Sequence, residues 1–236
     1  MNPETATAVD PHPGDIEPQT RRETCARSDP DTDARAGAEV QVGDEGRVDA
    51  DIDAEGWLAG AERRPSPSRD ARPPGTDIDL LVIHNISLPP GDFSGDWIDD
   101  LFLDRLDPAA HPYFREIAGL RVSAHLLIRR NGRLLQYVPF EQRAWHAGVS
   151  RFAGRERCND FSIGIELEGT DDIPFTEVQY ARLAKCTGQI LDRYPDITEE
   201  RIAGHAEIAP GRKTDPGPAF DWSRYRRSIS RRKLRS

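Results

Sequence analysis

The run Leu80-Leu81-Val82-Ile83-His84 decides the fold, since it is a short apolar stretch with branched residues that ends in a histidine. Such a run predicts a buried strand. The turn signal Pro89-Pro90-Gly91 follows a few residues later and ends it. His84 therefore lies near a strand end, where the functional groups of α/β sheets gather. The alternative for a histidine in an apolar strand is a packed core residue.

The segments after this strand alternate between helical and extended patterns. Residues 95–106 carry apolar side chains at helical spacing, which predicts a helix. Residues 122–130 and 134–140 both have the pattern of strands. Asn131-Gly132 lies between them and predicts a hairpin with a type I′ turn.

The remaining elements complete an α/β pattern. Residues 161–167 form another apolar strand, and a helix with the N-cap Thr176 runs to Tyr194-Pro195. A last short helix follows Asp221. The order of strand, helix, hairpin, strand and helix predicts a single α/β domain with a mixed central β-sheet flanked by helices.

Composition divides the chain of 236 residues into three parts. Residues 1–50 contain twelve acidic residues, five arginines and no aromatic residue, so we expect a disordered acidic extension. We expect the folded domain at 51–227. Residues 228–236 form a basic C-terminal tail, which is either frayed and solvated or in weak contact with acidic surfaces.

Charge and hydropathy exclude several classes of function. The net charge is −9, but residues 51–236 hold 29 acids and 27 bases, which argues against a nucleic-acid partner. The longest apolar runs, about five residues, are far too short to span a membrane. The N-terminus shows no secretory signal, and the three cysteines form no CxxC pair. These features favour a cytoplasmic protein without a membrane or nucleic-acid partner, which we expect to be a monomer.

The loop Gly204–Pro218 is the first candidate for a functional site. It holds His205, Lys213 and Asp215 among glycines and prolines that disfavour regular structure. An imidazole and a carboxylate on such a loop suit a divalent metal, although a solvated surface loop has the same composition. With His84 the set becomes two imidazoles and one carboxylate, which leaves a fourth position for water, as in catalytic zinc sites. The same ligand types also hold non-haem iron.

Glu166 is the candidate acid–base group. In strict alternation it shares one face of its strand with Ser162, Gly164 and Glu168, and Gly164 leaves room there for a close approach. A carboxylate at this place could act as general base on a metal-bound water. The alternative is an ordinary solvated strand face.

Six motifs together resemble one family. The chain resembles the AmpD family of cytoplasmic 1,6-anhydro-N-acetylmuramyl-L-alanine amidases of cell-wall recycling, which are zinc amidases related to peptidoglycan recognition proteins. The resemblance runs from about residue 55 to about residue 225, and residues 1–50 have no counterpart in it. The motifs that carry it are His84–Gly91, Arg121–His125, Arg143–Gly148, Arg155–Asp160, Gly164–Gly169 and Arg212–Pro218.

The resemblance implies a site and a reaction. It implies that His84, His205 and Asp215 bind one Zn²⁺ per chain, that Glu166 is the catalytic acid–base and that Lys213 stabilises the oxyanion. It also implies that substrate is contacted by Asn85, Arg121, Trp145 and Arg212. The expected reaction is hydrolysis of the amide between anhydro-N-acetylmuramic acid and L-alanine of the stem peptide, a small muropeptide.

Two other functions stay open at this point. One is an amidase that acts on intact peptidoglycan, against which the missing signal peptide counts. The other is a muropeptide-binding sensor without catalysis, against which the complete set of catalytic residue types counts. His125 and His146 lie beside the motifs as packing residues or as supports of the site.

Overall fold

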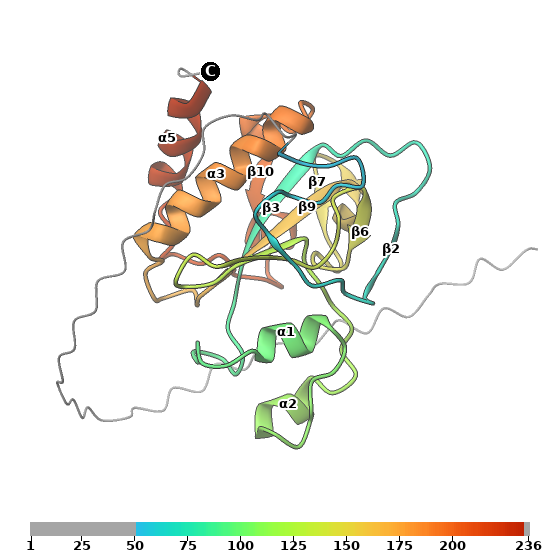
Figure 1. Cartoon of the computed structure of the whole chain (residues 1–236), viewed down its shortest axis with the longest axis vertical. Coiled ribbons are helices and arrows are strands. Elements are labelled where there is room, and N and C mark those ends of the chain that lie inside the picture. Colours follow the sequence, from blue (N-terminus) through green and yellow to red (C-terminus); the bar gives the residue numbers. More distant parts are fainter. Residues whose placement is uncertain (1–50, 234–236) are drawn as a thin grey trace, which may run out of the picture.

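The computed structural model describes residues 51–233, and Figure 1 shows their arrangement. The predicted disordered extension at 1–50 and the last three residues of the predicted basic tail lie outside the described residues. Within the described part, none of the helices is both long enough and apolar enough to cross a lipid bilayer.

A six-stranded sheet forms the centre of the domain. Its strand order is β1-β5-β4-β9-β3-β10, with bounds Glu62–Arg63, Leu134–Gln136, Leu126–Ile128, Ser162–Glu168, Leu80–Ile86 and Ile202–Gly204. Strands β4, β9, β3 and β10 run parallel, β1 is parallel to β5, and the β4–β5 hairpin is antiparallel. The predicted mixed sheet is confirmed.

Helices and small sheets surround this centre. One two-stranded sheet pairs β2 (Arg69–Ala71) with β6 (Gln142–Ala144). The other pairs β7 (Arg151–Phe152) with β8 (Arg155–Glu156). The α-helices α1 to α5 span Trp97–Phe102, Pro112–Glu116, Glu177–Arg193, His205–Ile208 and Trp222–Lys233. Short 3₁₀ turns lie at Cys158–Asp160 and Glu199–Arg201.

Successive side chains of the central strands point to opposite faces of the sheet. Leu81, Ile83, Ile163 and Ile165 face the main core, which α3 and α5 cover. The other face carries His84 and Glu166, and α1 and α2 pack on part of it (Figure 1). The domain is therefore a sheet with helices on both faces, and the candidate residues lie on the face away from α3.

The helix α3 begins where the sequence predicts. Thr176 accepts a hydrogen bond from the backbone N–H of Gln179, and the Gln179 side chain accepts one from the N–H of Thr176. This reciprocal capping box satisfies two N–H groups that a helix start leaves without partners. The helix ends at Tyr194, before Pro195, as predicted.

The β4–β5 hairpin is confirmed, but its predicted type I′ turn is wrong. That turn needs positive φ at both central residues, whereas Gly132 has φ 83° and Asn131 is not in the left-handed region. The N–H of Gly132 donates to the carbonyl of Arg129 at 2.8 Å. The loop is therefore a turn over Arg130 and Asn131 followed by a left-handed glycine.

Several other predicted bounds also change. The predicted helix at 95–106 is shorter, because the chain turns at Asp104, which has φ 56°. The predicted strand at 122–130 reduces to β4, since the N–H of Ser123 donates to Trp145 instead of extending the ladder. Helix α5 crosses the predicted domain end at residue 227, and the burial of Ile229 against the main core extends the packed domain past it.

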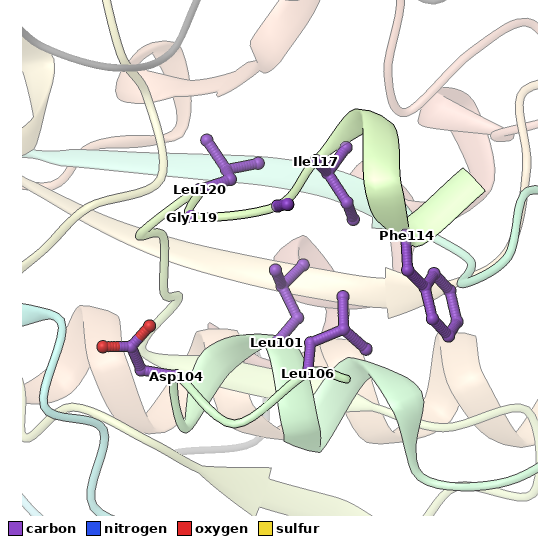
Figure 2. A pocket seen from close by; sticks show the side chains of 8 residues that line it. Leu101, Asp104, Leu106, Phe114, Ile117, Gly119 and Leu120 are labelled. Carbon is purple, nitrogen blue, oxygen red and sulfur yellow. The ribbon is translucent and has the colours of Figure 1, made fainter. Parts of the chain in front are cut away.

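A small pocket lies between α1 and the segment around α2 (Figure 2). Its volume is about 50 Å³, and its apolar lining includes Leu101, Phe114 and Ile117. A space of this size holds only a few water molecules. It is too small for a sugar or a peptide, and none of its lining residues belongs to the predicted site.

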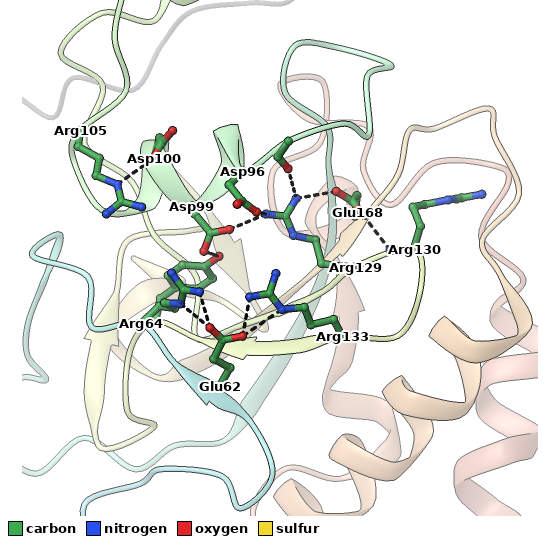
Figure 3. A network of polar contacts seen from close by, with 12 residues as sticks. Glu62, Arg64, Asp96, Asp99, Asp100, Arg105, Arg129, Arg130, Arg133 and Glu168 are labelled. Atoms are coloured by element: carbon green, nitrogen blue, oxygen red, sulfur yellow. Dashed lines mark hydrogen bonds and ion pairs between the residues drawn. The ribbon is translucent and has the colours of Figure 1, made fainter. Parts of the chain in front are cut away.

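A buried ionic network fixes α1 to the sheet (Figure 3). Arg129, the residue after β4, donates to Glu168 of β9 at 2.8 Å and to Asp99 of α1. The Tyr137 hydroxyl donates to Asp99 at 2.7 Å, and Glu168 also accepts from the N–H of Arg130 at 2.8 Å. Arg129, Asp99 and Glu168 are all buried.

Replacing Arg129 with Met should lower the free energy of unfolding by about 3–5 kcal/mol, because two buried carboxylates lose their cation. The control is Arg133→Met, since Arg133 pairs with Glu62 on the surface and such exposed pairs contribute about 0–1 kcal/mol. Urea unfolding of the two variants measures the difference. Equal losses would mean that the buried network contributes no more than an exposed ion pair.

Candidate active site

Three parallel strands bring the predicted site residues to one edge of the sheet. His84 of β3 is the register partner of Glu166 in β9. On the other side of β3, Gly204 of β10 pairs with Ile83, so His205 follows at the level of His84. Because the carboxyl ends of parallel strands meet at the same edge, residues far apart in sequence become neighbours there.

The side chains of His84, His205 and Asp215 converge on one point. Nδ1 of His84 lies 3.0 Å from Nδ1 of His205 and 3.0 Å from Oδ2 of Asp215, and the third side of the triangle is 3.1 Å. Tetrahedral ligands at bonds of about 2.0–2.1 Å would be about 3.3 Å apart. Among the described residues, this is the one group of His, Cys, Asp or Glu that gathers closely enough to hold a metal ion.

The far nitrogen of each histidine also has a partner. Nε2 of His205 lies 3.1 Å from the carbonyl oxygen of Ala147, and Nε2 of His84 lies 2.9 Å from Nδ1 of His146. A histidine that binds metal through Nδ1 carries its hydrogen on Nε2, and a partner there fixes the ring. The contacts on both sides of the rings therefore fit a metal centre.

Electrostatics keep His84 and Asp215 in the protonation states that a metal requires. Burial, followed by the neighbouring His205, lowers the pKa of His84 to about 4. Burial alone would raise the pKa of Asp215, but hydrogen bonds and charge from His205 and His84 bring it well below its usual range. A neutral His84 and an ionised Asp215 at neutral pH are the forms that bind metal.

Glu166 lies beside this triangle in a buried position, with 8% of its surface exposed. Its Oε2 accepts no hydrogen bond from any residue that the structure describes. Burial and then the charge of Asp215 raise the pKa of Glu166 well above its usual value, and Lys213 partly offsets this. The unsatisfied carboxylate oxygen fits a site built for a water molecule or a substrate. The predicted alternative of a solvated strand face is wrong.

The raised pKa of Glu166 gives a stability prediction for the metal-free protein. A carboxyl group whose pKa is higher in the folded state favours folding at low pH, and its contribution is lost as pH rises through the folded pKa. Glu166→Gln should therefore raise the unfolding free energy at pH 8, because the neutral amide avoids the cost of burying a carboxyl group that is ionised in the unfolded state. At pH 4 the variant should gain much less. Thermal unfolding at both pH values, with a chelator present, measures this, and an equal gain at both would contradict it.

Lys213 is the fifth residue of the predicted catalytic set, and it lies half-buried between Arg212 and Asp215 in the loop after α4. Its positive charge lowers the pKa values of both His84 and Glu166, although burial and nearer groups act more strongly on them. The ammonium group therefore acts electrostatically on the same site. The fold brings together the five residues that the sequence singled out.

The four predicted substrate-binding residues all make contacts within the protein. Asn85 donates to Asp171 at 2.7 Å, and the indole N–H of Trp145 donates to Asp70 at 3.2 Å. The guanidinium of Arg121 lies 5.5 Å from the centre of the Trp145 ring, and its Nε is 3.3 Å from Asp104. Arg121 and Trp145 therefore contact each other, whereas Asn85 contacts Asp171. The role of these three residues as substrate contacts stays a prediction.

Arg212 has a different environment. It donates to the carbonyl oxygens of Ala147 and Val149, both at 2.7 Å. Ala147 is also the residue that contacts Nε2 of His205. Arg212 therefore joins the loop of residues 147–149 to the loop that carries Asp215. Its role as a substrate contact stays a prediction.

Sequence reasoning missed Arg72, which binds the start of β9. Its guanidinium donates to the carbonyl oxygens of Phe140, Asp160 and Ser162, at 2.8–3.0 Å. Burial lowers its pKa to about 10. Its only signal was the neighbouring Pro73-Pro74 turn, and nothing in that turn reveals a buried arginine.

The comparisons with known proteins agree on one family. Residues 74–218 match the family described as N-acetylmuramoyl-L-alanine amidase. The chain is 63% identical over 177 residues to 1,6-anhydro-N-acetylmuramyl-L-alanine amidase AmpD of Escherichia coli K12, which covers 75% of this chain and 96% of that protein. It is 58% identical over 174 residues to the AmpD of Haemophilus influenzae, with 74% and 95% covered.

Solved structures give the same result. A crystal structure of a selenomethionine AmpD derivative superposes with a TM-score of 0.73 at 62% identity, over 75% of this chain and 98% of that one. The solution structure of Citrobacter freundii AmpD gives 0.57 at 60% identity, with 77% and 96% covered. The chain therefore belongs to the N-acetylmuramoyl-L-alanine amidase family.

Proposed function

We propose that this protein hydrolyses the amide bond between 1,6-anhydro-N-acetylmuramic acid and the L-alanine of the stem peptide, in cytoplasmic peptidoglycan recycling. The observation that carries the proposal is the convergence of His84, His205 and Asp215 beside a buried carboxylate, Glu166. The relatives named for this activity match over nearly their whole length, which supports the same substrate class.

His84, His205 and Asp215 would hold one zinc ion through Nδ1, Nδ1 and Oδ2. Two imidazoles and one carboxylate leave a coordination position open, as catalytic zinc sites do. When bound, zinc supplies a Lewis acid that polarises a carbonyl and lowers the pKa of water. The neutral histidine and ionised aspartate described above fit this ligand set without a change in protonation.

Glu166 is the proposed acid–base group. Its unsatisfied Oε2 can accept the proton of the attacking water. It then gives that proton to the leaving amine of L-alanine, so one residue serves both steps. A raised pKa suits this dual role, since an acid–base group works best when its pKa lies near the working pH.

Lys213 is the proposed oxyanion donor. As the water attacks, negative charge develops on the amide oxygen, and a nearby ammonium group stabilises it. Lys213 already acts electrostatically on His84 and Glu166 in the absence of substrate. This electrostatic influence on the site supports its role as the donor to the new charge.

Asn85, Arg121, Trp145 and Arg212 are the proposed substrate contacts. Guanidinium groups suit the carboxylates of a stem peptide through paired hydrogen bonds. The stacked pair of Arg121 and Trp145 offers one cationic and one aromatic surface at the same place. An aromatic face suits the apolar side of a sugar or peptide.

Product analysis tests the proposed function. The purified, zinc-loaded protein is incubated with an anhydro-muropeptide and, separately, with whole sacculi, and the products are analysed by mass spectrometry. The proposal expects free stem peptide and anhydro-N-acetylmuramic acid from the first substrate and far less release from the second. Efficient release from sacculi would instead show an amidase of intact peptidoglycan. Binding of muropeptide without any cleavage would show a sensor.

The oligomeric state and the location of the enzyme belong to the same proposal. We expect a monomer that acts on a small substrate in the cytoplasm. Size-exclusion chromatography with light scattering measures the first, and detection of the protein in fractionated cells measures the second. A stable dimer, or a protein recovered outside the cytoplasm, would require this part to be revised.

A further inference from the structure

We infer that His146 is a positioning residue, which fixes the orientation of His84 and the tautomer that binds metal. This inference rests on the metal centre of the proposed function. His146 lies on the loop after β6, between Trp145 and Ala147. His84 is the candidate ligand that lies within hydrogen-bond distance of its ring. His146 is buried.

His146 forms the middle of a chain of three side chains. Nε2 of His84 lies 2.9 Å from Nδ1 of His146, and Nε2 of His146 lies 3.1 Å from the hydroxyl of Ser162. The two rings are nearly perpendicular, with an interplanar angle of 85°. The chain therefore runs from the candidate ligand in β3 to the first residue of β9.

The hydrogen atoms of this chain follow from the ligand role of His84. If Nδ1 of His84 binds the metal, its hydrogen is on Nε2 and is donated to Nδ1 of His146. His146 then carries its own hydrogen on Nε2 and donates it to the Ser162 hydroxyl. The opposite tautomer of His146 would place two N–H groups against each other at 2.9 Å. Such an unpaired buried donor is costly.

The surroundings of His146 hold its ring in this one position. Its backbone N–H donates to the side chain of Asn159 at 3.1 Å, and the N–H of Ala147 donates to the same oxygen at 2.8 Å. The ring lies against Gly164, where a Cβ atom would come within 2.5 Å of the ring. Gly164 is therefore the residue whose missing side chain makes room for His146.

His125 provides a matched comparison within the same region. It is also buried, and its Nδ1 accepts from the N–H of Gly164 at 3.0 Å, while its Nε2 donates to the carbonyl of Gln142 at 3.1 Å. Its partners are the backbone of Gly164 and Gln142 and the side chain of Arg72, and none is a candidate ligand. Replacing it should affect stability without affecting the metal.

Zinc affinity of four variants tests the inference, with Zn²⁺ titrated against a competing chelator. His146→Leu fills the space without an acceptor and should weaken zinc binding by about 10–100-fold, the range for lost outer partners of metal ligands. His146→Asn presents an oxygen at the position of Nδ1 and should recover part of the loss. Ser162→Ala should weaken binding less than His146→Leu, and His125→Asn should leave it unchanged.

NMR of the histidine ring nitrogens in the zinc-loaded wild-type protein gives a second, independent readout. The inference expects the hydrogen of His146 on Nε2 and an unprotonated Nδ1. A hydrogen on Nδ1 would overturn it, as would wild-type zinc affinity in His146→Leu. If His146→Leu does not fold, the test rests on the tautomer of His146 in the wild-type protein and on the zinc affinity of Ser162→Ala.

Failure of the proposed function has a different signature. In that case the wild-type protein would bind no zinc, or His84→Ala would bind it as tightly as wild type. A wild-type protein that binds zinc through His84, together with an unaffected His146→Leu variant, would overturn the positioning role alone.

Discussion

Replacing Glu166 with Gln is expected to reduce the amidase rate by about 10²–10⁴, the usual contribution of a general base. The variant should still hold about one zinc per chain, as expected of the wild-type protein. Gln keeps the shape of the side chain but has no basic carboxylate to take the proton of water. Metal analysis and the amidase assay on one preparation measure both quantities.

Glu168→Gln is the matched control, because Glu168 lies on the same face of β9 and pairs with Arg129 instead of facing the site. It should lose stability while most of its rate per folded molecule remains. If Glu166→Gln lost its metal, Glu166 would be a ligand or would support one. If it kept both metal and full rate, another residue would be the base.

Replacing any one of His84, His205 and Asp215 with Ala is expected to remove zinc and activity together. Each substitution removes one of three protein ligands, and the remaining two hold the ion far less tightly. Metal content after dialysis should fall from about one per chain to near zero, and the rate should fall to background. Lys213→Ala should instead keep its metal and lose about 10²–10³ in rate, as expected for one oxyanion donor.

His111→Ala is a control for the loss of a histidine as such. His111 lies at the start of α2, where its Nδ1 accepts from the N–H of Tyr113 at 3.1 Å. It should keep full zinc content. A ligand variant that also kept full zinc would show that its residue does not bind the metal.

The sequence predicted those parts of the fold that depend on local patterns. The apolar run at Leu80–His84, the capping box at Thr176 and the hairpin at Asn131-Gly132 all appear where expected. Their signals come from neighbouring residues, whether alternation, a side-chain cap or a glycine with positive φ. The prediction of a type I′ turn was wrong because the dipeptide Asn131-Gly132 is equally compatible with a three-residue loop that ends in a left-handed Gly132.

The sequence could not predict what depends on register between distant strands. His84 pairs with Glu166 because β3 and β9 align along their whole length, and no local pattern contains that alignment. Likewise, the contact between His84 and His146 joins residues 62 positions apart. The residue types of the candidate site were therefore predictable through family resemblance, while the outer contacts of its histidines were not.

Strand β10 is the last strand of the sheet and pairs with β3 over three residues only, Ile202 to Gly204. Such a short edge strand opens by local unfolding more readily than the centre of a sheet. An ion held by His84 on one side and by His205 and Asp215 on the other binds only the closed form. By linkage it stabilises that form by about RT ln(1 + [Zn²⁺]/Kd). Amide hydrogen exchange at residues 202–204 therefore reports the occupancy of the metal centre directly, without a substrate.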